Sequence, residues 1–183
     1  MAPARVLVVA ATERELAGAL GASVLACGVG PVEAAAATAR ILVVERPGAL
    51  LHVGIAGARG LPPGTAVLGT EALYDDIAAA VPVVARTFPD AGLVAALRSA
   101  LPELRPLPIG TSARVGGTRV AEVEAMEGFG VLRAAELAGV AAVEVRVVAN
   151  EIDEPDRARW RFAEALAALE ELTPRLVETL AAA

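Results

Sequence analysis

Short continuous apolar runs alternate along this chain with longer segments that have helical periodicity. Residues 6–10, 23–26 and 50–53 are apolar runs of strand length, and 65–73 reads as a further strand. Thr12 opens a short helix to about residue 20, and Pro31 suits the first turn of an alanine-rich helix over 32–45. The first half of the chain therefore predicts strand and helix in regular alternation.

The second half continues this alternation with more interruptions. We expect a helix over 90–101, capped by Asp90 and stopped by Pro102. Residues 104–111 contain two prolines, so we expect an edge strand at most, and 112–118 reads as a short strand or a loop. The remaining expected elements are a helix over 125–137, a strand over 141–149, a helix from Asp153 to about 169, and a last helix or kinked continuation from Thr173.

This order of elements predicts an α/β protein with a mostly parallel, mixed sheet and helices on both faces. Strands that alternate with helices pair in parallel, because each helix carries the chain back across the sheet. With 183 residues the chain has the length of a single domain, so we expect one three-layer domain over residues 1–183. Ligands of such folds bind at the carboxyl ends of the strands.

One predicted strand carries polar residues where a buried strand should be apolar. In 141–149 and the residue after it, Glu144, Arg146 and Asn150 point to the same side because side chains alternate along a strand. Buried polar groups are costly unless paired, so structural pairing is one explanation and a functional site the other. We expect them to form a site together with Glu127, which lies in an acidic cluster at an expected helix start.

Composition excludes several classes of function. The net charge of −6 and the scattered arginines disfavour nucleic acid as a partner, and the apolar runs are too short for a membrane span. The chain has no lysine, one histidine (His52) and one cysteine (Cys27), which excludes a phosphate-binding loop with its lysine and makes a metal site improbable. We expect no metal and no cofactor, and the lone cysteine fits a reducing cytoplasm.

Five short motifs, taken in order, resemble the nucleoside phosphorylase and nucleosidase family. They are Ala10-Ala11-Thr12-Glu13-Arg14-Glu15, Gly28-Val29-Gly30-Pro31-Val32-Glu33-Ala34-Ala35, Gly54-Ile55-Ala56-Gly57, Met126-Glu127-Gly128 and Arg146-x-x-x-Asn150. The resemblance runs from about residue 5 to 169. Within the family the chain most resembles the futalosine hydrolase branch. The third and fourth of these motifs favour this branch, and so do Glu144-x-Arg146 and the segment from Asp156 to Trp160. The resemblance implies a nucleosidase with a small-molecule nucleoside substrate, working as a homodimer or larger homo-oligomer.

The resemblance also implies roles for single residues. Glu13 would be the general base for water, with Arg146 keeping it ionised, and Glu127 would bind the ribose hydroxyls while Met126 packs against the sugar. Asn150 would recognise a 6-oxopurine such as hypoxanthine, because its amide offers hydrogens to acceptors at O6 and N7. Gly28, Ile55, Gly57 and Val115 are the other expected substrate contacts.

Departures from the family pattern sharpen this expectation and leave alternatives open. His52 and Ile55 stand where phosphorylases of the family carry an arginine and a serine for phosphate, which favours water as the acceptor. The residue that stacks on the base is open: Phe88 has no obvious place, and Val115, backbone or a neighbouring subunit remain candidates. A methylthioadenosine or adenosylhomocysteine nucleosidase and a non-catalytic nucleoside-binding protein are the alternatives. Cations for a carboxylate on the substrate are expected from three loop arginines, Arg59, Arg114 and Arg119.

Overall fold

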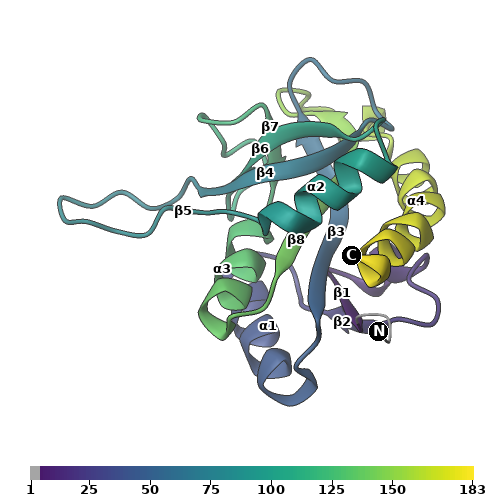
Figure 1. Ribbon diagram of the computed structural model, residues 1–183. Coiled ribbons are helices and arrows are strands. Elements are labelled where there is room, and N and C mark those ends of the chain that lie inside the picture. The colour runs from purple at the N-terminus through teal and green to yellow at the C-terminus, as the bar shows by residue number, and fades with distance from the viewer. Residues whose placement is uncertain (1–4) are drawn as a thin grey trace.

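The computed structural model describes residues 5–183, and Figure 1 shows a twisted sheet enclosed by helices. Most elements lie where the sequence predicts them. The strands are Val6–Ala10 (β1), Ser23–Ala26 (β2), Ala49–Ala58 (β3), Ala66–Tyr74 (β4), Arg86–Thr87 (β5), Arg105–Thr111 (β6), Val123–Ala125 (β7) and Ala142–Glu151 (β8). The helices are Pro31–Glu45 (α1), Ala91–Ala100 (α2), Gly128–Ala138 (α3) and Phe162–Ala182 (α4), with short 3-10 helices at Glu13–Leu16 (η1) and Arg157–Arg159 (η2).

The sheet is mixed and mostly parallel, as expected for this α/β class. Its order is β2-β1-β3-β7-β6-β4-β5, and β8 pairs with both β3 and β4. Five of the strands therefore form a closed ring, through the pairings β3–β8, β8–β4, β4–β6, β6–β7 and β7–β3. This closure leaves few unpaired strand edges in the centre of the molecule.

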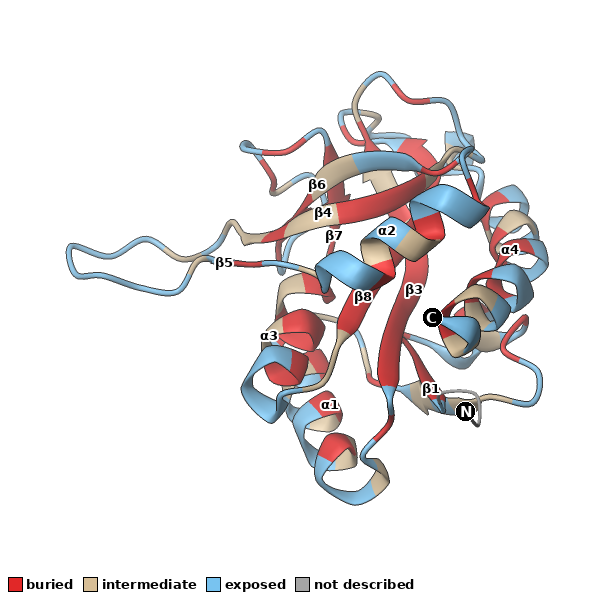
Figure 2. Ribbon diagram, viewed as in Figure 1, coloured by how far each residue is buried: buried red, intermediate tan, exposed pale blue. Residues whose placement is uncertain are grey.

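Helices cover both faces of the sheet, and alternate residues of one strand serve the two faces. On β1, Val6 and Val8 pack into a core cluster with α2 and α4, whereas Leu7 and Val9 pack into another with α1 and α3. The strand is buried on both sides, which explains its continuous apolar sequence. Figure 2 shows the same pattern, with buried strands between helices whose outer faces are exposed.

Strand β6 lies between β4 and β7 at its carboxyl end, so the expectation of an edge strand is wrong for residues 109–111 and holds for residues 105–108. It pairs in parallel with β4 from Arg105 onward, but its pairing with β7 begins only at Ile109. Pro106 and Pro108 come before that point. Residues 105–108 have no partner strand on the β7 side, so no hydrogen bond there requires the N–H group that proline lacks. The proline-containing half of β6 thus keeps the environment of an edge strand.

Two helix starts also differ from the sequence prediction. The acidic cluster around Glu124 begins as strand β7, because it pairs with β3 and β6, and α3 starts only at Gly128. The segment from Asp153 to Arg161 is irregular except for η2, and α4 starts at Phe162. Helix α4 then continues through Pro174 to Ala182. Of the two alternatives at Thr173, a new helix or a continuation, the structure has the continuation.

Candidate active site

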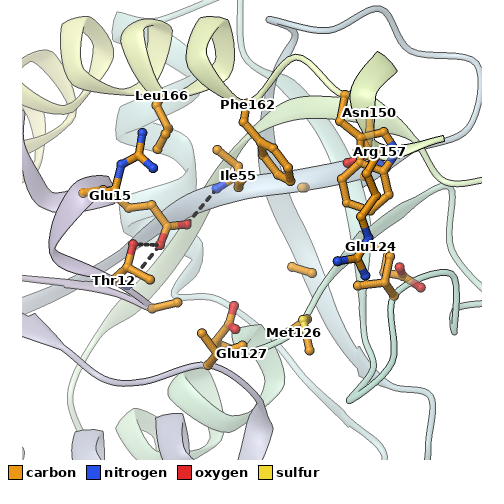
Figure 3. Close-up of a pocket in the computed structure, with 18 residues that line it drawn as sticks. Thr12, Glu15, Ile55, Glu124, Met126, Glu127, Asn150, Arg157, Phe162 and Leu166 are labelled. Carbon is orange, nitrogen blue, oxygen red and sulfur yellow. Dashed lines mark hydrogen bonds between the residues drawn. The ribbon is translucent and has the colours of Figure 1, made fainter. Parts of the chain in front are cut away.

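A cavity of about 500 Å³ lies where β1, β3 and β8 end. This is the position that ligands occupy in α/β sheets. Its walls come from five segments distant in sequence, and Figure 3 shows their side chains around it. The lining residues are Ala11, Thr12, Arg14, Glu15, Val29, Ile55, Ala56, Gly57, Val115, Glu124, Ala125, Met126, Glu127, Asn150, Arg157, Trp160, Phe162 and Leu166.

Glu15 is the carboxylate that η1 directs into this pocket. Its Oε2 accepts hydrogen bonds from the Thr12 backbone N–H (3.0 Å) and from Thr12 Oγ1 (2.8 Å), and its Oε1 accepts from the Ile55 backbone N–H (3.2 Å). The side chain is buried, and Figure 3 shows it pointing into the cavity from the η1 side. Both oxygens are held by donors, so the carboxylate is fixed in position.

Glu13 does not occupy the place predicted for it. It is exposed and is not among the residues that line the pocket. Both glutamates belong to the same 3-10 turn, and the turn directs Glu15 inward and Glu13 outward. The pattern Thr12-x-x-Glu15 is the capping-box signature, in which the acidic residue folds back on the first residue, and this signal points to Glu15.

Glu127 lies across the cavity from Glu15 at the start of α3. Its Oε1 accepts a hydrogen bond from the Gly30 backbone N–H (3.1 Å), and its Oε2 is 3.4 Å from Arg146 Nη2. Met126 lines the pocket beside it. Two carboxylates on separate elements, Glu15 and Glu127, therefore face one cavity.

Arg146 is fully buried behind these carboxylates and does not itself line the pocket. Its Nε donates to Glu144 Oε1 (2.8 Å), and its Nη1 donates to the Ile55 carbonyl (3.5 Å). A Cβ atom on Gly54 would touch both Arg146 and Glu15, so the missing side chain lets the cation approach that carboxylate. The predicted partnership with Glu13 is wrong, because Arg146 pairs with Glu144 and Glu127.

His52 completes the buried network and is not free to bind a ligand. Its Nδ1 lies 3.0 Å from the Val9 carbonyl and its Nε2 contacts Arg146 Nη2. Burial and the charge of Arg146 hold the pKa of His52 well below its ordinary value of 6.5. The neutral ring then donates from Nδ1 to Val9 and accepts from Arg146 at Nε2.

Asn150 reaches the pocket from the end of β8, and Figure 3 places it at the far end of the cavity from Glu15. The β3–β8 register shifts between Ala56 and Gly57, so that Gly57 is opposite Asn150. The Asn150 Nδ2 donates to the Glu151 carbonyl (3.0 Å), which leaves its second hydrogen unused within the described chain.

Two aromatic residues, Trp160 before α4 and Phe162 at its start, form one wall of the pocket. Neither is among the site residues that the sequence predicts. Trp160 and Phe162 pack edge to face with ring centroids 5.3 Å apart, and the Arg157 guanidinium lies 5.4 Å from the Trp160 ring centroid. Trp160 belongs to the segment used for the resemblance, whereas no sequence signal singled out Phe162, which lies inside the helix predicted from Asp153 and is the first residue of α4 in the structure. Phe88 is 63% exposed and does not line the pocket.

The arginines that line the pocket are Arg14 and Arg157, and not the three expected from the loops. Arg59 binds Asp153 and the carbonyl groups of Ala121 and Thr118, so it fastens loops together. Arg114 and Arg119 are exposed and do not line the pocket. Neither lining guanidinium forms an ion pair with any residue in the described range 5–183.

The other expected contacts are distributed as follows. Ile55, Gly57 and Val115 line the pocket, whereas Gly28 lies next to it and Val29 supplies the lining side chain. Gly28 has φ +87°, a left-handed conformation that favours glycine, so its role is to turn the backbone. Glu124 accepts from the backbone N–H groups of Gly116 (2.5 Å) and Thr118 (2.6 Å) and thereby holds the loop that carries Val115.

Three further observations concern the thiol, metal binding and membrane spans. Cys27 is buried, and burial, together with the charge of Glu127, raises the pKa of its thiol to about 12, so a thiolate does not form at neutral pH. Within residues 5–183 no group of three or more His, Cys, Asp or Glu side chains is arranged to hold a metal ion. None of the described helices has the length and apolar character of a membrane span.

Comparison with known proteins identifies the family. The family model described as the phosphorylase superfamily matches residues 10–183. This chain belongs to the phosphorylase superfamily. A futalosine hydrolase from Streptomyces coelicolor is 37% identical over 189 residues, an alignment that covers 87% of this chain and 80% of that protein.

Solved structures of two nucleoside-cleaving enzymes share the fold. The 5'-methylthioadenosine/S-adenosylhomocysteine nucleosidase from Neisseria meningitidis, in complex with methylthio-immucillin-A, has a TM-score of 0.85 at 21% identity, covering 96% of this chain and 99% of that one. The native futalosine hydrolase of Helicobacter pylori has a TM-score of 0.85 at 14% identity, covering 94% of this chain and 97% of that one. At these identities the likeness concerns the fold.

Proposed function

We propose that this chain is a nucleosidase that hydrolyses the N-glycosidic bond of futalosine and releases hypoxanthine, within menaquinone biosynthesis. The observation that carries the proposal is the pair of buried carboxylates, Glu15 and Glu127, facing one pocket with Arg146 behind them. The 37% identity to a futalosine hydrolase supports the choice of substrate. The single buried cysteine fits a reducing compartment, the cytoplasm.

Glu15 takes the role of general base in this proposal. Breaking the bond develops positive charge on the ribose while water attacks C1', and a carboxylate near that carbon both removes a proton from water and stabilises the cation. The donors from Thr12 and Ile55 hold Glu15 in place for this task. Glu127 is free on its pocket side to accept hydrogen bonds from the ribose hydroxyls, and Met126 packs beside the sugar.

Asn150 binds the leaving base. One amide hydrogen is used by the Glu151 carbonyl, and the other is available to an acceptor at O6 or N7 of a 6-oxopurine. A neutral donor at this place stabilises the negative charge that the base gains as the bond breaks. Trp160 and Phe162 supply apolar surface for the flat parts of the ligand.

Water, and not phosphate, is the proposed acceptor. A phosphorylase needs cations and hydroxyl groups that face phosphate beside the ribose. Here Ile55 gives this part of β3 an apolar side chain at the pocket, and His52 is held between Val9 and Arg146, out of the pocket.

The lining arginines are the proposed partners for the carboxylate that futalosine carries on its benzoate group. Arg14 and Arg157 border the pocket without an ion pair to any described residue. A planar guanidinium suits a carboxylate, and Arg157 is already held against the Trp160 ring.

We also propose a homodimer or larger homo-oligomer, built around an apolar arm. Figure 1 shows the connection between β4 and β5 projecting from the body of the molecule, and Figure 2 shows it exposed. This arm, residues 75–85, contains the sequence Val81-Pro82-Val83-Val84, in which all three valines are exposed. An exposed apolar segment of this kind is typical of an interface.

Base release from purified protein tests the proposed function. Futalosine, inosine, methylthioadenosine and adenosylhomocysteine are supplied separately, with and without millimolar phosphate, and free hypoxanthine or adenine is quantified by chromatography. We expect hypoxanthine from futalosine at a rate independent of phosphate. Preferred release of adenine would identify the alternative nucleosidase, a phosphorylated sugar product would refute hydrolysis, and binding without turnover would identify a nucleoside-binding protein.

A further inference from the structure

Glu144 is the most deeply buried carboxylate of the network behind the pocket. Its side chain is 1% exposed, and its Oε1 accepts from Arg146 Nε at 2.8 Å. Its Oε2 is buried and has no hydrogen-bond partner among the described residues. Gly128 and Gly69 pack directly against it, and a Cβ atom on Gly128 would collide with both of its oxygens.

One guanidinium serves three carboxylates at this place. Arg146 Nε is used by Glu144, Nη2 faces His52 and Glu127, and Nη1 lies on the side of Glu15. His52 is neutral and adds no positive charge. If all three carboxylates were ionised, the buried cluster would carry an excess of two negative charges, which a low-dielectric interior strongly disfavours.

The three carboxylates differ in what stabilises their negative charge. Glu15 and Glu127 accept backbone N–H hydrogen bonds and border the pocket. Glu144 receives one hydrogen bond, from Arg146, and does not reach the pocket. A proton added to the cluster therefore belongs on Glu144, because this carboxylate accepts the fewest hydrogen bonds of the three and has no contact with the pocket.

We propose that Glu144 is protonated and acts as a positioning residue, whose Oε1 holds Arg146 in place. Because a protonated Glu144 is neutral, the positive charge of the guanidinium compensates the negative charges of Glu127 and Glu15. Burial raises the pKa of Glu144 above its ordinary value of 4.5, and the charge of Glu127 acts in the same direction while Arg146 opposes it. The groups that face Glu144 are Arg146 on its own strand, neutral His52 on β3 and Glu127 at the start of α3, and Gly69 on β4 packs against it without a side chain.

The pH dependence of folding tests the proton directly. If Glu144 is protonated in the folded chain and ionised in the unfolded chain, the folding constant of the wild type falls about tenfold per pH unit relative to Glu144→Gln. This fall begins above pH 4.5 and ends at the raised pKa of the folded chain. Denaturant unfolding of both proteins from pH 4 to 8 measures the difference. Parallel curves would overturn the proposal and make Glu144 an ordinary buried ion-pair partner.

An infrared measurement on the wild type applies even if Glu144→Gln does not fold. We expect the carbonyl-stretch band of a protonated carboxylic acid in the folded protein at pH 7, lost on unfolding. Asp75 is the matched control, because burial also raises its pKa, so the band must persist in Asp75→Asn. Absence of the band, or its loss in that control, would overturn the proposal.

Activity tests the positioning role, which rests on the proposed function. Glu144→Gln keeps the acceptor for Arg146 and should retain kcat and KM within about threefold, whereas Glu144→Leu removes it and should lower kcat at least tenfold. A loss in the Gln variant as large as in the Leu variant would refute a neutral Glu144. If the wild type cleaves no nucleoside, the proposed function fails, while the unfolding and infrared results still decide where the proton lies.

Discussion

The backbone N–H of Ile55 donates a hydrogen bond to Glu15 Oε1 at 3.2 Å, which joins the turn after β1 to the middle of β3. These residues are 40 positions apart in the chain. The bond holds the Glu15 carboxylate at the pocket wall, beside the side chain of Ile55 that also lines the pocket.

Glu15→Gln should lower kcat for base release by about 100- to 10,000-fold with a much smaller change in KM. The amide keeps the size of the side chain but cannot take a proton from water. Steady-state kinetics with futalosine measures the effect. Glu13→Gln is the matched control, two residues away on the exposed side of the same turn, and should retain activity within about threefold. The reverse pattern would return the base to Glu13.

Asn150→Asp should narrow or reverse a preference for 6-oxopurine over 6-aminopurine nucleosides. A carboxylate repels O6 unless it is protonated, and a mismatch of this kind leaves buried polar groups unpaired. The ratio of kcat/KM for inosine-type and adenosine-type substrates measures it in both proteins. Asn150→Ala should lower turnover of both. A ratio that does not change in Asn150→Asp would show that the base is recognised elsewhere.

Arg14→Gln combined with Arg157→Gln should raise KM for futalosine at least tenfold and leave the KM for inosine nearly unchanged. Only the first substrate carries the carboxylate that these guanidinium groups are proposed to bind. Arg114→Gln with Arg119→Gln is the control, because both residues are exposed and lie outside the pocket lining. Equal losses for both substrates would mean that the lining arginines shape the pocket and do not select the carboxylate.

His52 should make folding less stable at acid pH. Its folded pKa lies below 6.5, so its contribution to stability is complete above that pH and is lost as the pH falls, because the unfolded chain binds a proton that the folded chain rejects. Relative to His52→Gln, the wild type should lose about 1.4 kcal/mol of unfolding free energy per pH unit below 6.5. Urea unfolding between pH 5 and 7.5 measures this. If the difference in unfolding free energy between the two proteins did not change with pH, the buried ring would take up its proton at the same pH as in the unfolded chain, and the prediction would be wrong.

Exchange of the three exposed arm valines, Val81, Val83 and Val84, for serine should shift the protein toward the monomer in light scattering after size exclusion. The arm contributes nothing to the described core, so the unfolding free energy of the chain should stay the same. Serine at Val43 and Val44, exposed on α1, is the control. A wild type that is monomeric at assay concentration would refute the oligomer.

The sequence by itself determined the class of fold, because that information is local. The continuous apolar run of β1 and the proline at the start of α1 predict their elements without reference to the rest of the chain. The alternation along β8 also placed Glu144 and Arg146 on one face, which the 2.8 Å bond between them confirms. Local sequence carries no information on long-range pairing, so it predicts a helix start where β7 lies and an edge strand where β6 lies.

Only the tertiary structure decided which residues of each motif face the pocket. Glu13 and Glu15 are the same residue type in one turn, and although Thr12-x-x-Glu15 has the capping-box spacing, the donors that fix Glu15 at the pocket include an N–H on β3. Likewise Arg146 finds its partners on β3, α3 and its own strand, and Arg59, expected at the site, instead binds across two loops. The sequence specifies which chemical groups are present, whereas their direction depends on contacts between segments that folding alone brings together.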